Sequence, residues 1–133
     1  MKKLIVFDGN SILNRAFYGI RPLTTKDGLH TNAVYGFLNI IKKHLDAFKP
    51  DGAVCAFDLK APTFRHKRYE GYKATRKGMP EELAMQLPYA KEAISLLGIK
   101  IFEKEGFEAD DILGTFARQA EENEIKCRIV PGV

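Results

Sequence analysis

The chain has 133 residues, of which 45% are hydrophobic, and its formal net charge is +4. This length and composition fit one globular domain, and no apolar run approaches the length of a membrane span. Cys55 and Cys127 lie in apolar runs and form no Cys-x-x-Cys pair, so we expect two buried free thiols rather than a zinc site or a disulfide framework. These features predict a soluble, cytoplasmic protein.

Hydrophobic periodicity predicts short strands that alternate with helices. The predicted strands are residues 4–7, 53–57, 99–102 and 126–130. The predicted helices are residues 10–17, from 33 to the proline at 50, from 80 to 98, and 109–123, and residues 21–32 form a loop with a turn at Asp27-Gly28. We expect Asn10 or Ser11 to cap the first helix, and Pro88 to kink or restart the third. Such alternation implies an α/β fold with helices on both faces of a mainly parallel sheet.

Positive charge is concentrated in one segment. Between Lys60 and Lys77 there are seven Lys or Arg and one acidic residue, a local net charge of +6, so the remaining residues carry a net charge of −2. Aromatic side chains are interleaved with these cations, among them Tyr69 and Tyr72. A charge run alone is usually a solvated surface. A local basic segment with aromatic residues also suits a polyanion such as nucleic acid.

Carboxylates recur where the predicted strands end. Asp8 and Asp58 each follow a phenylalanine at the end of an apolar run, and a cluster of Glu108, Asp110 and Asp111 opens the helix after the third strand. Taken singly, such acids are ordinary turn residues or helix caps. Because the carboxyl ends of parallel strands meet at one edge of the sheet, however, all five are expected there, where they repel one another unless a cation is bound. Oxygen ligands suit Mg²⁺ or Mn²⁺, so the residues indicate metal-assisted phosphodiester chemistry.

Four motifs carry a resemblance to a known family. They are Phe-Asp-Gly-Asn-Ser at residues 7–11, Phe-Asp at 57–58 continuing to Pro-Thr-Phe-Arg-His at 62–66, Tyr-Lys-Ala-Thr-Arg at 72–76, and Glu-Ala-Asp-Asp-Ile-Leu-Gly at 108–114. In order and spacing, the chain resembles the 5′-nuclease domain found at the N-terminus of bacterial DNA polymerase I, in the flap-endonuclease superfamily. The resemblance implies a three-layer α/β/α PIN-like fold. It also implies 5′-3′ exonuclease and 5′-flap endonuclease activity on DNA in replication and repair.

The same resemblance assigns site residues. It implies that the metal ligands, for Mg²⁺ or Mn²⁺, are Asp8, Asp58, Glu108, Asp110 and Asp111. It implies that the DNA contacts, on an arch of about residues 60–80, are Arg65, Tyr72, Lys73 and Arg76. Lys73 and Arg76 would act at the scissile phosphate. We expect DNA with 5′ ends or flaps as the partner and no small-molecule cofactor or membrane; the oligomeric state is left open.

The chain departs from the family after the fourth predicted strand. The family continues there with a Thr-Gly-Asp-x-Asp motif that builds a second metal position, whereas this chain has Pro131 in place of the Thr and Val133 in place of the first Asp. We therefore expect residues 1–133 to be the N-terminal portion of a 5′-nuclease domain, incomplete at the C-terminus, without the helix–hairpin DNA-binding element or a polymerase region. The alternative is a catalytically inactive DNA-binding remnant. An aspartate-based phosphotransfer domain is disfavoured, because it needs a second carboxylate where Asn10 stands.

Overall fold

A four-stranded parallel sheet forms the centre of the computed structural model, which describes residues 2–58, 80–103 and 109–130. The strand order is β3-β2-β1-β4, and each neighbouring pair is parallel. The strands are β1 (Lys3–Asp8), β2 (Gly52–Ala56), β3 (Lys100–Phe102) and β4 (Lys126–Val130). Each of the four predicted strands is present, with bounds that differ by at most one residue at either end except at β4, where they agree.

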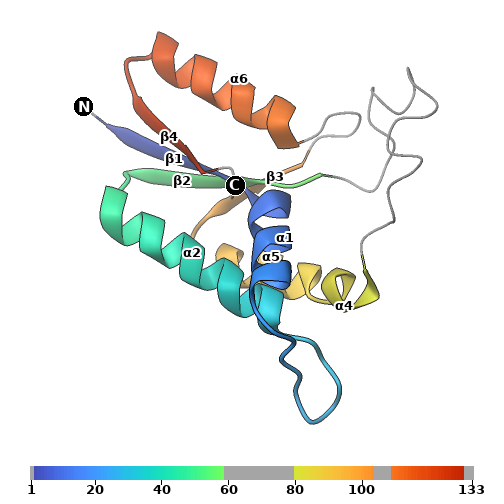
Figure 1. Cartoon of the computed structure of the whole chain (residues 1–133). Coiled ribbons are helices and arrows are strands. Elements are labelled where there is room, and N and C mark those ends of the chain that lie inside the picture. The colour runs from blue at the N-terminus through green and yellow to red at the C-terminus, as the bar shows by residue number, and fades with distance from the viewer. Residues whose placement is uncertain (1, 59–79, 104–108, 131–133) are drawn as a thin grey trace, which may run out of the picture.

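Helices cover both faces of the sheet, so the predicted three-layer α/β/α arrangement is confirmed (Figure 1). The helix α6 packs on one face against β1, β2 and β4, while α1, α2 and α5 lie on the other face. The helices of the described residues are α1 (Gly9–Gly19), α2 (Asn32–Phe48), α4 (Glu81–Ala84), α5 (Leu87–Leu96) and α6 (Ala109–Glu122). Within this part of the chain, no helix is both long enough and apolar enough to cross a membrane.

Local signals in the sequence explain most helix ends. Between α4 and α5 the helix breaks and restarts, and Pro88 lies in the first turn of the new helix, where its missing N–H costs nothing. Gly98 follows α5 with φ of +84°, a left-handed conformation that glycine adopts without strain. The predicted turn is also present: Gly28 has φ of +86° and its N–H donates to the Thr25 carbonyl at 3.0 Å. The helix α2 ends at Phe48, just before Pro50.

The expected cap of α1 is wrong. Asp8, not Asn10 or Ser11, is the N-cap residue, because the strand runs directly into the helix and leaves the Asp8 carboxylate beside the free N–H groups of the first turn. Asn10 and Ser11 are already inside the helix. The same aspartate therefore ends β1 and starts α1.

Two hydrophobic clusters lie on the two faces of the sheet. The larger one fills the space between β1, β2 and the helices α1, α2 and α5, and includes Phe7, Phe37 and Phe57. The smaller one lies between the sheet and α6, and includes Ala56 and, at its margin, Phe102. The two cysteines are free as predicted, but only Cys55 is buried; Cys127 is half-buried because β4 lies at the edge of the sheet.

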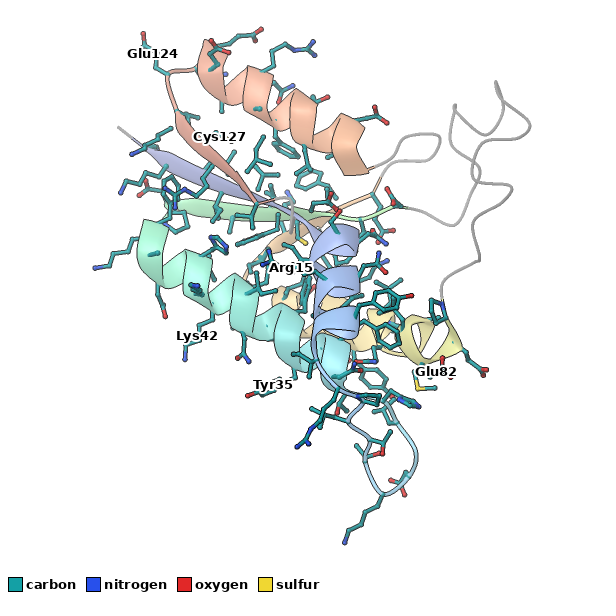
Figure 2. All side chains as sticks on the ribbon, in the orientation of Figure 1. Arg15, Tyr35, Lys42, Glu82, Glu124 and Cys127 are labelled. Atoms are coloured by element: carbon teal, nitrogen blue, oxygen red, sulfur yellow. The ribbon has the colours of Figure 1, made fainter. Side chains whose placement is uncertain are left out.

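A buried polar network fixes the helices of the larger layer to one another. The Gln86 side chain is fully buried, and its Oε1 accepts from the N–H groups of Ala33 and Val34 at 2.8 and 3.0 Å, in the first turn of α2. Its Nε2 donates to Asn32 Oδ1 at 3.0 Å and to the Glu82 carbonyl at 2.9 Å. This one side chain therefore joins the start of α2 to α4 and stabilises the helix layer. Figure 2 draws the side chains of this layer and labels Glu82 of α4.

Candidate functional site

Asp8 lies at the carboxyl end of the inner strand β1 and is 4% exposed. Its Oδ1 accepts from the Ser11 N–H at 3.1 Å and its Oδ2 accepts from the Ser11 hydroxyl at 2.7 Å. A carboxylate oxygen has more than one acceptor direction, so this capping leaves the residue able to bind a cation as well. The cap fixes the rotamer of Asp8 at the edge of the sheet where ligands bind in parallel α/β folds.

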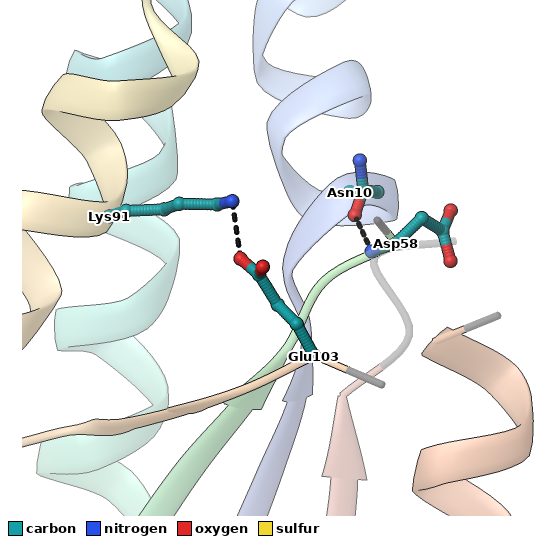
Figure 3. A network of polar contacts seen from close by, with 4 residues as sticks. All are labelled: Asn10, Asp58, Lys91 and Glu103. Carbon is teal, nitrogen blue, oxygen red and sulfur yellow. Dashed lines mark hydrogen bonds and ion pairs between the residues drawn. The ribbon is translucent and has the colours of Figure 1, made fainter. Parts of the chain in front are cut away.

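Asp58 lies just beyond the end of the neighbouring strand β2 and is half-buried. Its backbone N–H donates to Asn10 Oδ1 at 2.7 Å, which ties it to the first turn of α1 (Figure 3). The preceding residue, Phe57, is fully buried, and its N–H donates to the Phe102 carbonyl at 3.0 Å. The chain at Asp58 is thus fixed on one side by β3 and on the other by α1.

Glu103 is a third carboxylate at this edge and is not among the site residues predicted from the sequence. It follows β3 directly and forms an ion pair with Lys91 of α5 (Figure 3). The Lys91 ammonium also lies 5.1 Å from the centroid of the Phe57 ring, a cation–π distance. The signal was present in the sequence, because Phe7-Asp8, Phe57-Asp58 and Phe102-Glu103 repeat the same pair of residue types at the ends of three strands.

Asp111 approaches the same region from the other layer. It lies in the first turn of α6 and lines a pocket with a cavity volume of about 260 Å³, together with Glu103 and the aromatic residues Phe102 and Phe116. The two rings meet edge to face with their centroids 4.8 Å apart, which packs the middle of α6 against β3. The pocket therefore lies between the end of β3 and α6, and both Glu103 and Asp111 border it.

Charged side chains at this edge of the sheet shift the pKa of a residue in the core. Burial raises the pKa of the Cys55 thiol well above its usual value of 9.0, and the negative charge of Asp8 raises it further, whereas Lys91 lowers it. Cys55 is therefore a neutral thiol, and its pKa depends on the charges of both Asp8 and Lys91. Lys91 supplies a positive charge that belongs to the protein itself.

Part of the predicted site lies outside the described residues. This applies to Glu108, to the side chain of Asp110 and to the four predicted DNA contacts, which are Arg65, Tyr72, Lys73 and Arg76. Of the five predicted metal ligands, the structure places Asp8, Asp58 and Asp111 beside one edge of the sheet. Within the described residues, no three His, Cys, Asp or Glu side chains converge closely enough to hold a metal ion. The predicted donors are all carboxylate oxygens, which fits a hard divalent cation.

Known proteins match this chain along almost its whole length. The family model for the 5′-3′ exonuclease, N-terminal resolvase-like domain, matches residues 3–132. The chain belongs to this family. Among curated relatives, DNA polymerase I of Caldicellulosiruptor bescii is 45% identical over 98% of this chain, and DNA polymerase I of Bacillus subtilis is 42% identical over 98%. The thermostable DNA polymerase I of Thermus thermophilus is 44% identical over 96%. In each case the chain spans 15% of the relative's length.

Solved structures agree on the fold. A bacteriophage T5 flap endonuclease, in a complex with DNA and metal ions, superimposes with a TM-score of 0.63 at 17% identity, over 98% of this chain and 48% of its own. The T5 5′-exonuclease with bound zinc gives a TM-score of 0.60 at 16% identity, over 91% of this chain and 45% of its own. The predicted family membership and α/β fold are confirmed.

Proposed function

We propose that this chain carries part of the active site of a divalent-metal-dependent 5′-nuclease that hydrolyses phosphodiesters at the 5′ ends and flaps of DNA during replication and repair. The proposal extends to Mg²⁺ or Mn²⁺ as the cofactor. It draws on the family of the chain, on the relatives named as DNA polymerase I, and on the T5 enzyme in complex with DNA and metal ions.

The observation that carries the proposal is the position of two acids, one buried and one half-buried, where two paired strands end. Asp8 is in register with Ala56 of β2, and Asp58 follows two residues later, so both acids come at the carboxyl end of the same ladder. Holding like charges at one partly buried edge is costly, and a bound divalent cation would offset that cost.

The chemistry divides between the cation and the residues of the chain. A bound divalent cation would polarise the phosphate and activate water for in-line attack. Asp8 and Asp58 would hold it from the sheet, and Glu108, Asp110 and Asp111 from the start of α6. In this proposal Lys73 and Arg76 offset the charge that develops on the phosphate, while Arg65 and Tyr72 hold the 5′ strand.

The test is cleavage of a labelled 5′-flap duplex by the purified chain in Mg²⁺ or Mn²⁺. Asp58→Ala should abolish metal-dependent cleavage, whereas Asp46→Ala, which removes an acid of α2 far along the chain from the site, should leave it unchanged. DNA binding is measured in parallel at several salt concentrations. Because Lys and Arg release counterions from DNA, the affinity should fall steeply as salt rises.

The outcomes separate nuclease from remnant. Cleavage that is lost in Asp58→Ala supports the nuclease. Binding without cleavage in either metal overturns it and leaves the catalytically inactive DNA-binding form. Absence of both binding and cleavage overturns both functions for this chain.

A further inference from the structure

The end of β2 is fixed by two hydrogen bonds of different kinds. The regular ladder of β2 ends at Ala56, and the next N–H, that of Phe57, still donates to a main-chain carbonyl on β3. One residue later the donor is the Asp58 N–H, and its acceptor is a side chain, Asn10 Oδ1, at 2.7 Å. The position of the Asp58 backbone therefore depends on the position of Asn10 (Figure 3).

Asn10 is the second residue of α1, a helix that Asp8 caps by accepting from the Ser11 N–H. Gly9, between the two, lies so close to Phe57 that a Cβ there would come within 2.4 Å of the ring. This contact brings the first turn of α1 near enough to the end of β2 for the short Asn10 side chain to reach Asp58.

We propose that Asn10 is a positioning residue for the cation site, which sets where Asp58 lies relative to Asp8. The inference rests on the proposed function, because it takes Asp58 to be a ligand of the cation. The amide suits this role because it accepts a hydrogen bond without adding a further negative charge to an edge that already carries several.

The first readout is independent of any metal. Amide hydrogen exchange, followed by NMR in EDTA, measures the protection of the Asp58 N–H. Asn10→Ala removes the acceptor, so this amide should exchange about three- to ten-fold faster, in line with the net worth of one hydrogen bond. Asn10→Asp keeps an acceptor oxygen at the same place, so protection should be retained. Asn39→Ala, which removes an asparagine of α2, is the matched control.

The second readout is Mn²⁺ affinity, measured by isothermal titration calorimetry. Asn10→Ala should weaken binding by about three- to ten-fold. Without the hydrogen bond that orders Asp58 in the unchanged chain, part of the binding free energy of Mn²⁺ must order this residue. Asn10→Gln moves the same amide one methylene further out and should weaken binding in the same direction, so it serves if the alanine variant does not fold. Asn39→Ala should bind as the unchanged chain does.

Each outcome decides a different point. Unchanged Mn²⁺ affinity in Asn10→Ala, with Asp58→Ala still impaired, overturns the role of Asn10 alone. Unchanged affinity in Asp58→Ala overturns Asp58 as a ligand, and with it the role of Asn10. An unchanged chain that binds no Mn²⁺ overturns the metal-dependent function as well. Faster exchange at Asp58 together with weaker binding in Asn10→Ala, and neither change in Asn39→Ala, supports the proposal.

Discussion

Gly9→Ala tests how tightly α1 is packed against the end of β2. A Cβ at this position would lie 2.4, 2.6 and 2.7 Å from three atoms of the Phe57 ring. Real Cβ contacts of this kind are not that short, so the ring or the helix must shift. The ring has little room to do so, because Phe57 is fully buried, with Phe37 at 6.3 Å between ring centroids and the Lys91 ammonium at 5.1 Å.

Two effects of opposite sign compete in this variant. Alanine is favoured over glycine in a helix by at most about 1 kcal/mol, and less in a first turn. Overpacking a well-filled core costs about 1–3 kcal/mol. Since three contacts are too short at once, we expect the cost to exceed the gain, with a net loss of about 1–2 kcal/mol in the free energy of unfolding. The displaced ring should also move Asp58, so Mn²⁺ affinity should fall with it.

Urea unfolding followed by circular dichroism measures the loss, and two further variants identify its cause. Gly19→Ala, in the same helix but with no atom within 4 Å of the added Cβ, should be as stable as the unchanged chain or more stable. Phe57→Leu makes room for the new methyl group, so the double variant should be less destabilised than the sum of the two single variants by about 1 kcal/mol or more. Strict additivity, or a Gly9→Ala variant at least as stable as the unchanged chain, would refute the close contact.

Three further predictions concern the core and its charges. Gln86→Leu leaves buried N–H groups of α2 without their acceptor and should lower the free energy of unfolding by about 2–4 kcal/mol in urea. Cys127 should react with a disulfide reagent such as DTNB in the folded protein well before Cys55, whose burial and raised pKa protect it until the chain unfolds. Burial, and next the charge of Arg128, lower the pKa of His44 below its usual 6.5, so NMR should show that Arg128→Gln raises this pKa. The folded chain takes up the His44 proton at a lower pH than the unfolded chain does. The contribution of His44 to folding stability is therefore fully present above pH 6.5 and is progressively lost below it.

Controls for these predictions come from the same chain. Gln119→Leu, at an exposed position of α6, should change the free energy of unfolding by less than about 0.5 kcal/mol. A Gln86→Leu variant with an equally small effect would contradict the network. Equal reaction rates of the two thiols in the folded state would contradict the burial of Cys55. A His44 pKa that does not respond to Arg128→Gln would contradict the proximity of the two side chains.

The sequence predicted the strands well because each is a short apolar run that ends at an acid or a turn. It misplaced the cap of α1, since Asn10, Ser11 and Asp8 are all good capping residues and only the absence of a linker between β1 and α1 selects Asp8. It could not reveal the Asn10–Asp58 bond, which joins residues 48 positions apart. Side chains that meet across elements depend on the packing of those elements, and no local pattern records it.

The face on which each acid emerges separates Glu103 from the aspartates. In a strand, successive side chains point to opposite faces, and residues in register on parallel strands point to the same face. Ala56 is in register with both Asp8 and Phe102, and it packs on the α6 side of the sheet. The Asp8 side chain therefore points to the face of the sheet that is covered by α6, the helix that contains Asp111.

The Glu103 side chain points to the opposite face of the sheet from Asp8. It follows Phe102, which packs toward α6, so the next side chain turns toward α5, where Lys91 lies. The Phe57 side chain points to the same face as Glu103 and contacts the same lysine. One repeated pair of residue types therefore places Asp8 on the α6 side of the sheet and Glu103 on the α5 side, where it pairs with a lysine of the protein. We infer that a divalent cation held on the α6 side of this edge does not take Glu103 as a ligand, because the Glu103 side chain lies toward α5, beside Lys91.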